Sequence, residues 1–167
     1  MAVILITGGA RSGKSTRAEA RARSFPGQLV YIATAEALDG EMQERIAKHR
    51  ARRGTDWIER EAPLDLVQAL VETEGGGARL VDCLTLWLSN LLHSERDWLR
   101  EVTRLADVLP RLRSPVIMVT NEVGLGIVPD NALARSFRDA AGIMNQIIAG
   151  VADEVEFVVA GLPMKLK

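Results

Sequence analysis

The residues with the most definite chemistry lie near the start of the chain, in the segment Gly8-Gly9-Ala10-Arg11-Ser12-Gly13-Lys14-Ser15. The segment matches the pattern G-x-x-x-x-G-K-[ST] in full, and it stands between an apolar run and a helical pattern. Glycines let consecutive backbone N–H groups turn toward an anion, and the N-terminal end of the following helix adds a partial positive charge. Lys14 can reach the β- and γ-phosphates, and the Ser15 hydroxyl can ligate Mg²⁺. The segment therefore predicts a site for a nucleoside triphosphate.

A second acidic group is expected where another strand ends, because Mg²⁺ bound to a triphosphate is commonly held by a carboxylate as well. Asp82 follows two apolar residues in Leu80-Val81-Asp82-Cys83 and is the candidate. The alternative is that Asp82 caps the helix that follows, and the two roles do not exclude each other.

The chain has two histidines, His49 and His93. His49 lies in the most basic stretch, residues 44–53, and nearby cations favour the neutral, nucleophilic form of an imidazole. By itself, however, a histidine at a cationic helix end is usually a surface residue or a partner of the helix dipole. His93 ends a Leu-rich helical run, and a surface residue is the favoured interpretation there.

The triphosphate motif alone leaves several classes of protein open. A switch GTPase would usually carry an Asn-Lys-x-Asp segment after a strand, whereas Thr120-Asn121-Glu122-Val123 occupies such a place without the Lys and the Asp. The short length favours a small-molecule kinase. A nucleotide-binding module without enzymatic activity is the alternative from another class.

The elements that would hold these residues alternate along the chain. They predict an α/β domain of the P-loop NTPase type over residues 1–167, with three layers, a largely parallel sheet and a C-terminal hairpin. Strands are expected from apolar runs at residues 2–6, 29–33, 80–83, 116–120 and 155–159. Helices are expected at residues 15–23, 38–53, 63–74, 95–109 and 130–152.

Local signals set the expected ends of several elements. Pro63 is a favoured first residue of a helix, and Ser94 is a plausible N-cap. Gly161-Leu162-Pro163 is the expected turn of the hairpin, between residues 155–160 and 164–167. The Met and Trp residues are expected to pack in the core or in an interface, among them Trp57, Trp87 and Trp98.

Composition limits the function classes further. The 167 residues include 21 Lys and Arg and 22 Asp and Glu, so the formal net charge is −1, with 47 % hydrophobic and 26 % charged residues. This balance is typical of a globular protein and argues against a disordered chain, a disulfide scaffold and general nucleic-acid binding. The single cysteine, Cys83, fits a reducing cytosol. No targeting or membrane-spanning segment is recognised, so a cytoplasmic protein is expected.

Several segments together carry a resemblance to a known family. They are the phosphate motif, Tyr31-Ile32-Ala33-Thr34-Ala35, Asp39-Gly40-Glu41-Met42 with His49, and above all Thr120-Asn121-Glu122-Val123-Gly124-Leu125-Gly126-Ile127-Val128-Pro129. Over nearly its whole length the chain resembles the bifunctional adenosylcobinamide kinase / adenosylcobinamide-phosphate guanylyltransferase family of cobalamin biosynthesis.

The resemblance implies a homotrimer that phosphorylates adenosylcobinamide with GTP or ATP and then transfers GMP from GTP to adenosylcobinamide phosphate. The products of the transfer are adenosylcobinamide-GDP and pyrophosphate. The GMP is expected to pass through a covalent intermediate on the histidine that matches His49. The alternative within this family is a chain with guanylyltransferase activity alone.

Nucleotide contacts are also implied by position. They fall on residues 8–15, Ala33-Thr34-Ala35, Arg50-Ala51-Arg52-Arg53, Glu61 and Asp82, with Ser15 and Asp82 as the expected Mg²⁺ ligands. The block 120–129 has two open interpretations: its Gly and Pro residues shape a loop, or the block contacts the corrinoid or another subunit.

Overall fold

The sheet organises the molecule. We describe a computed structural model in which residues 2–36 and 54–167 are placed. Its seven-stranded sheet has the order β3-β2-β4-β5-β1-β6-β7, and within the described residues every pairing except β6 with β7 is parallel. The strands are β1 (Val3–Gly8), β2 (Leu29–Ala33), β3 (Trp57–Glu61), β4 (Arg79–Asp82), β5 (Val116–Asn121), β6 (Glu154–Val159) and β7 (Leu162–Lys165).

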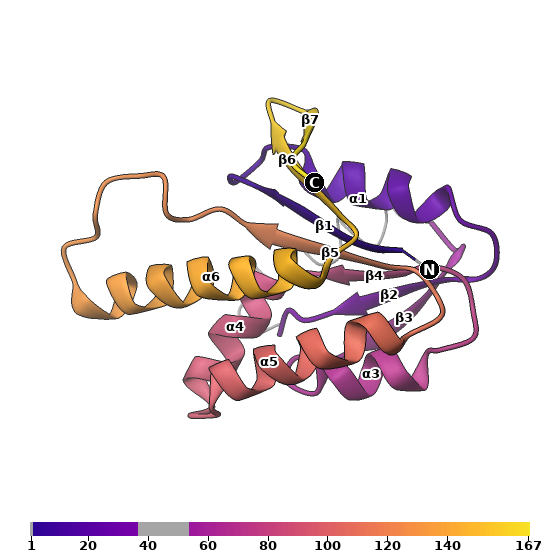
Figure 1. Cartoon of the computed structure of the whole chain (residues 1–167), viewed down its shortest axis with the longest axis horizontal. Helices are drawn as coiled ribbons and strands as arrows, with labels where there is room; N and C mark the ends of the chain where they lie inside the picture. The colour runs from indigo at the N-terminus through magenta and orange to yellow at the C-terminus, as the bar shows by residue number, and fades with distance from the viewer. Residues whose placement is uncertain (1, 37–53) are drawn as a thin grey trace.

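Helices cover both faces of the sheet and make three layers (Figure 1). One face carries α1 (Lys14–Arg23); the other carries α3 (Leu66–Glu72), α4 (Leu84–His93), α5 (Trp98–Val108) and α6 (Ala132–Val151). Alternate residues of β1 serve the two layers, since Ile4 and Ile6 pack in the cluster with α1, and Val3 and Leu5 in the cluster with the other helices. The expected α/β fold with a largely parallel sheet is confirmed.

The five expected strands are present as β1, β2, β4, β5 and β6, with ends shifted by at most two residues. The sequence analysis missed β3. Of its five residues only Trp57 is buried, so no apolar run marks it. The expected helix at 38–53 lies outside the described residues.

Two expected helix starts are wrong. α3 begins at Leu66 rather than at Pro63, with Asp65 as N-cap. Ser94 does not begin a helix, because its N–H donates to the carbonyl of Asn90 (2.9 Å) and closes α4 instead. Asp97 is the cap of α5, and its side chain accepts a hydrogen bond from the Arg100 N–H (3.1 Å).

The C-terminal hairpin is confirmed with a tighter turn than expected. β6 and β7 pair antiparallel around Ala160 and Gly161, whose φ angles are 51° and 80°. Positive φ at both turn residues is the geometry that suits a two-residue hairpin. Pro163 lies inside β7, at the edge of the sheet, where its missing N–H costs no strand pairing.

The expected packing of large side chains holds in part. Trp57 and Trp87 are buried, and so are Met118 and Met144, whereas Met164 on β7 is exposed. Among the described residues, no helix combines the length and the apolar character needed to span a bilayer.

Candidate functional site

The phosphate motif forms the connection between β1 and α1, as expected. Gly13, with φ of 95°, is the N-cap of α1 and provides no side-chain cap, and no acidic residue occupies the first turn. Arg11 also has a positive φ, 55°. The first N–H groups of α1 therefore keep their hydrogen-bonding capacity for an anion, reinforced by the helix dipole.

Lys14 lies against this loop. Its Nζ is 2.9 Å from the carbonyl oxygen of Gly9, and the residue is buried. The hydroxyls of Ser12 in the loop and of Thr7 near the end of β1 are buried and have no hydrogen-bond partner in the described part of the chain. Buried polar atoms without partners are uncommon and often mark binding sites. This loop has the donors and the geometry to hold phosphate oxygens.

Close contacts explain why glycine is needed at two positions of the loop. A Cβ on Gly8 would lie 2.5 Å from the carbonyl oxygen of Val158, and one on Gly13 would lie 3.1 Å from the Cα of Gly161. The Gly161 N–H also donates to the carbonyl of Ser12 (2.8 Å). β6 and the hairpin turn therefore support the loop from the side away from β5.

Three other predicted site residues meet at the same edge of the sheet. Ala33 is the register partner of both Glu61 and Asp82, so the three lie in one row across β3, β2 and β4. Because parallel strands end together, this row lies at the same edge as Gly8, which pairs with Asn121. Residues predicted from distant segments are thus brought together.

Asp82 does not cap the next helix, since the N-cap of α4 is Cys83 and no side-chain cap bond is formed. Instead the Tyr31 hydroxyl donates to Asp82 Oδ2 (3.0 Å). A carboxylate that accepts one such bond keeps lone pairs for a hard cation, and a serine hydroxyl with a carboxylate suits Mg²⁺. Ser15 and Asp82 therefore fit that ion.

Thr34 has a structural role that the sequence did not indicate. Its buried hydroxyl accepts from the Cys83 N–H (2.8 Å) and donates to the Cys83 carbonyl (2.7 Å), while Asn90 donates to the Thr34 carbonyl (2.7 Å). Thr34 thus joins the ends of β2 and β4.

Burial raises the pKa of the Cys83 thiol to about 11, so the thiol is protonated and unreactive at neutral pH.

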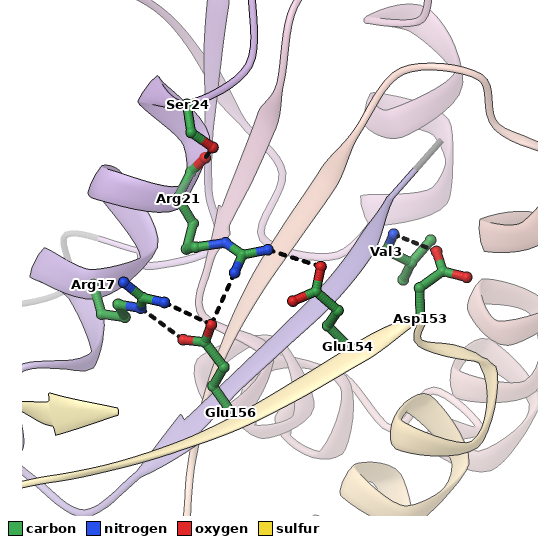
Figure 2. A network of polar contacts seen from close by, with 7 residues as sticks. All are labelled: Val3, Arg17, Arg21, Ser24, Asp153, Glu154 and Glu156. Atoms are coloured by element: carbon green, nitrogen blue, oxygen red, sulfur yellow. Dashed lines mark hydrogen bonds and ion pairs between the residues drawn. The ribbon is translucent and has the colours of Figure 1, made fainter. Parts of the chain in front are cut away.

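Asn121, in the predicted block 120–129, ends β5 next to Gly8, and its N–H donates to the Thr85 hydroxyl (2.7 Å). The sequence analysis missed the group of charged residues near the loop. A cluster of four charged residues lies beside α1: Arg17, Arg21, Glu154 and Glu156 (Figure 2). The only signal in the sequence is spacing, because two arginines four apart on a helix and two glutamates two apart on a strand each share one face.

The remaining predicted residues lie outside the described part of the chain or have surroundings that do not by themselves indicate a site. His49 and Arg50-Ala51-Arg52-Arg53 lie outside the described residues. His93 is exposed at the end of α4, with Nδ1 2.7 Å from the carbonyl oxygen of Ser89 in its own helix. In the block 120–129, Thr120 is buried, whereas Leu125 and Ile127 are 80 % and 97 % exposed.

Comparison with known proteins adds to this geometry. Residues 4–166 match the family described as cobinamide kinase / cobinamide phosphate guanyltransferase. The chain is 51 % identical to the bifunctional adenosylcobalamin biosynthesis protein CobP of Pseudomonas aeruginosa, over 98 % of this chain and 96 % of that protein. It is 41 % identical to the bifunctional adenosylcobalamin biosynthesis protein CobU of Salmonella typhimurium, over 99 % of both chains.

Among solved structures, the chain resembles an ATPase of the type III secretion system of pathogenic bacteria. The TM-score is 0.56 at 12 % identity, over 98 % of this chain and 56 % of that one. At this identity the likeness concerns the fold, and it agrees with the expected P-loop NTPase type.

Proposed function

The chain belongs to the cobinamide kinase / cobinamide phosphate guanyltransferase family, and from that premise we propose that residues 1–167 form one domain whose triphosphate site serves two reactions. The protein phosphorylates cobinamide and transfers a guanylyl group to cobinamide phosphate in adenosylcobalamin biosynthesis. The observation that carries the proposed site is the complete phosphate loop, with uncapped N–H groups at the start of α1.

In the kinase reaction, the loop and Lys14 hold the β- and γ-phosphates of GTP or ATP. The aminopropanol hydroxyl of adenosylcobinamide attacks the γ-phosphorus, the bond from that phosphorus to the bridging oxygen breaks, the nucleoside diphosphate leaves, and the hydroxyl proton passes to the solvent. Ser15 and Asp82 would hold Mg²⁺, which neutralises phosphate charge when bound. Positioning and electrostatics supply most of the rate in such a transfer, so no dedicated base is assigned.

In the transferase reaction, a ring nitrogen of neutral His49 attacks the α-phosphorus of GTP. The bond to the β-phosphate oxygen breaks and pyrophosphate leaves. An oxygen of adenosylcobinamide phosphate then attacks the same phosphorus, the P–N bond breaks, and free His49 is restored with adenosylcobinamide-GDP as product. Splitting the transfer into two displacements lets one site serve two acceptors in turn. The support for His49 is the resemblance of the segment around it.

The guanine nucleotide is proposed to extend from the loop along the row of Ala33, Glu61 and Asp82. Ala35, the backbone of Thr34, and Arg50-Ala51-Arg52-Arg53 complete the proposed contacts. The cations among them would stabilise the charge on the triphosphate.

The exposed apolar residues after β5 support a contact role for the block 120–129. Leu125, Ile127 and Val128 are all largely exposed. A loop whose shape depended only on its glycines and its proline would not require large exposed apolar side chains, and such a group of side chains is typical of a contact surface. We propose that this segment contacts the corrinoid or a second subunit of a homotrimer.

A cytoplasmic location is proposed from the free, buried thiol of Cys83.

The decisive experiment follows the guanylyl group. Wild-type protein incubated with GTP and Mg²⁺, without corrinoid, should gain the mass of one GMP and release pyrophosphate. The adduct should be labile in acid and stable in alkali, because protonation makes the imidazole a better leaving group. His49→Ala should remove the adduct and the transfer, and retain part of the kinase activity, since the substrate hydroxyl attacks the γ-phosphate directly.

His93→Ala is the matched control and should form the adduct normally. A GMP-sized mass gain that persists in the His49 variant would move the nucleophile elsewhere. A wild-type adduct without phosphorylation of cobinamide would show that the chain has transferase activity but no kinase activity. No adduct and no turnover would point to a binding module.

A further inference from the structure

The ion pairs beside α1 are centred on one buried carboxylate. Glu156 on β6 is 4 % exposed and accepts from Arg17 at both oxygens, with Nε 2.7 Å from Oε2 and Nη2 2.8 Å from Oε1. Arg21 donates to Oε1 as well (3.0 Å), and its second nitrogen donates to Glu154 (2.9 Å). Figure 2 shows both arginines reaching from α1 to the same strand.

The helix held by this network is the one that begins the phosphate site. α1 starts at Lys14 and Ser15, and Arg17 closes its first turn. Its N–H donates to the carbonyl of Gly13 (3.0 Å), so the backbone of Arg17 is bonded directly to the loop. A displacement of Arg17 would therefore displace the N–H groups that face a phosphate.

β6 and the hairpin turn after it contact the loop at two further points. The Val158 carbonyl on β6 lies against Gly8, and the Gly161 N–H in the turn donates to the Ser12 carbonyl. The strand and the turn together thus contact the start of the loop, its end and the helix after it. Two arginines and two glutamates cancel in charge, so the network contributes position rather than a field that attracts phosphate.

We propose that Glu156 is a positioning residue for the phosphate loop: through Arg17 and Arg21 it fixes α1 on β6 in the orientation that binds the triphosphate in both reactions. The inference rests on the proposed function in one respect, that the loop binds GTP. It assigns to the C-terminal part of the chain a role in nucleotide affinity.

The substitution Glu156→Gln separates position from charge. A glutamine presents an NH₂ group to guanidinium groups that can only donate, so one of the paired bonds to Arg17 is lost. By charge alone the variant should bind GTP more tightly, because Arg17 is freed. Arg17 is one-third exposed and therefore well screened, and Glu154 still neutralises Arg21, so we expect the loss of orientation to dominate.

The test compares three proteins by titration calorimetry with Mg²⁺ and a GTP analogue that has a methylene group in place of the oxygen between the α- and β-phosphates, well below their unfolding temperatures. The analogue cannot transfer its GMP to His49, so its Kd is an equilibrium value and stands for the Kd of GTP. Glu156→Gln should raise the Kd for GTP about tenfold. In steady state, KM for GTP should rise in both reactions while kcat changes little. Glu74→Gln is the matched control: it also neutralises a carboxylate paired with a buried arginine, Arg79, but without contact to α1. It should lower stability and leave the Kd unchanged.

Two further measurements make the outcomes distinct. A lost orientation should persist between about 0.1 M and about 1 M KCl, whereas a pure charge effect should vanish at high salt. Amide hydrogen exchange of the Arg17 N–H, which is bonded to Gly13, and of the N–H groups that follow it in α1 should be faster in Glu156→Gln than in Glu74→Gln, with no nucleotide present. Equal Kd values for wild type and Glu156→Gln, or tighter binding, would overturn the inference. A wild type that fails to bind GTP would instead overturn the proposed function, and the exchange data would still decide whether Glu156 fixes α1.

Discussion

In the described part of the chain, the buried Arg79 with its partners and the half-buried cluster beside α1 both pair arginine with glutamate, but they connect different elements. Arg79 is the first residue of β4, and its side chain donates hydrogen bonds to the backbone carbonyls of Leu70 (2.6 Å) and Ser114. It also forms an ion pair with Glu74 (3.1 Å). The cluster beside α1 joins side chain to side chain, between a helix and a strand. The first ties loops at the start of the strands. The second holds the element that starts the phosphate site.

The charges of the two clusters are stabilised differently. Burial lowers the pKa of Arg79, and the attraction of Glu74 opposes that effect. Burial alone would raise the pKa of Glu74, but the N–H groups of Ser114 and Arg113 together with Arg79 bring it below the ordinary value. The pKa of Glu156 is lowered mainly by the hydrogen bonds from Arg17, against burial. The ionised form of Glu74 is thus stabilised mainly by backbone N–H groups, and that of Glu156 by the arginines of α1. We therefore expect an ion pair to contribute to stability or to binding according to the elements that it connects.

The largest expected effect is on stability, from Arg79→Ala. The change leaves two carbonyls and the Glu74 carboxylate without their partner, and should cost about 3 kcal/mol of unfolding free energy. GTP affinity of the folded protein should not change, because β4 keeps Asp82 in place. Urea denaturation and calorimetry measure the two quantities. A large loss of GTP affinity with unchanged stability would erase the distinction between the clusters.

Lys14→Ala should lower activity far more than stability, the reverse of Arg79→Ala. Its buried Nζ donates to the Gly9 carbonyl within the loop, so we expect stability to change less than in Arg79→Ala. kcat/KM should fall about 100-fold in both reactions, because charge on the phosphates loses a stabilising cation. Lys165→Ala, on the exposed strand β7, is the control. Unchanged kcat/KM in both reactions would end the role assigned to Lys14.

The smallest effect should appear in acid. Glu74 and Glu156 both have a pKa below the ordinary 4.5 in the folded protein, so each contributes stability above pH 4.5 that is lost as the pH falls through its lowered pKa. Glu74→Gln and Glu156→Gln should each make the decline of Tm with acid shallower. Thermal scans between about pH 3 and about pH 7 test this. If neither substitution changes the slope, these carboxylates do not account for the acid loss.

The sequence predicts best those parts of the molecule whose signal is local. The phosphate loop follows from four fixed positions, and β1 and β5 follow from continuous apolar runs. β3 was missed because it is an edge strand with one buried residue, Trp57. Ser94 and Asp97 are both good caps, and only the closing turn of α4 decides that the helix starts after Asp97.

The clusters themselves had no local signal. Arg17 and Glu156 are separated by 139 positions, so no window of the sequence contains both partners. Arg79 resembles an ordinary charged residue at the start of an apolar strand, because its partners come from α3, from the turn after α3 and from a residue two positions before β5. Likewise the row of Ala33, Glu61 and Asp82 could be predicted only through the resemblance, since strand order is a property of the whole chain.

The position of β1 in the sheet also sets the order in which the protein can be built during synthesis. β1 lies between β5 and β6, so Val3 pairs with Val116 and Ile4 with Glu154. The apolar strand that leads into the phosphate loop is synthesised before both of its neighbours, so it stays unpaired until β5 and β6 have left the ribosome. Such non-local pairing slows folding and exposes an unpaired apolar segment to aggregation in the meantime. Competence to bind a triphosphate is therefore acquired late, when the hairpin has folded against the loop.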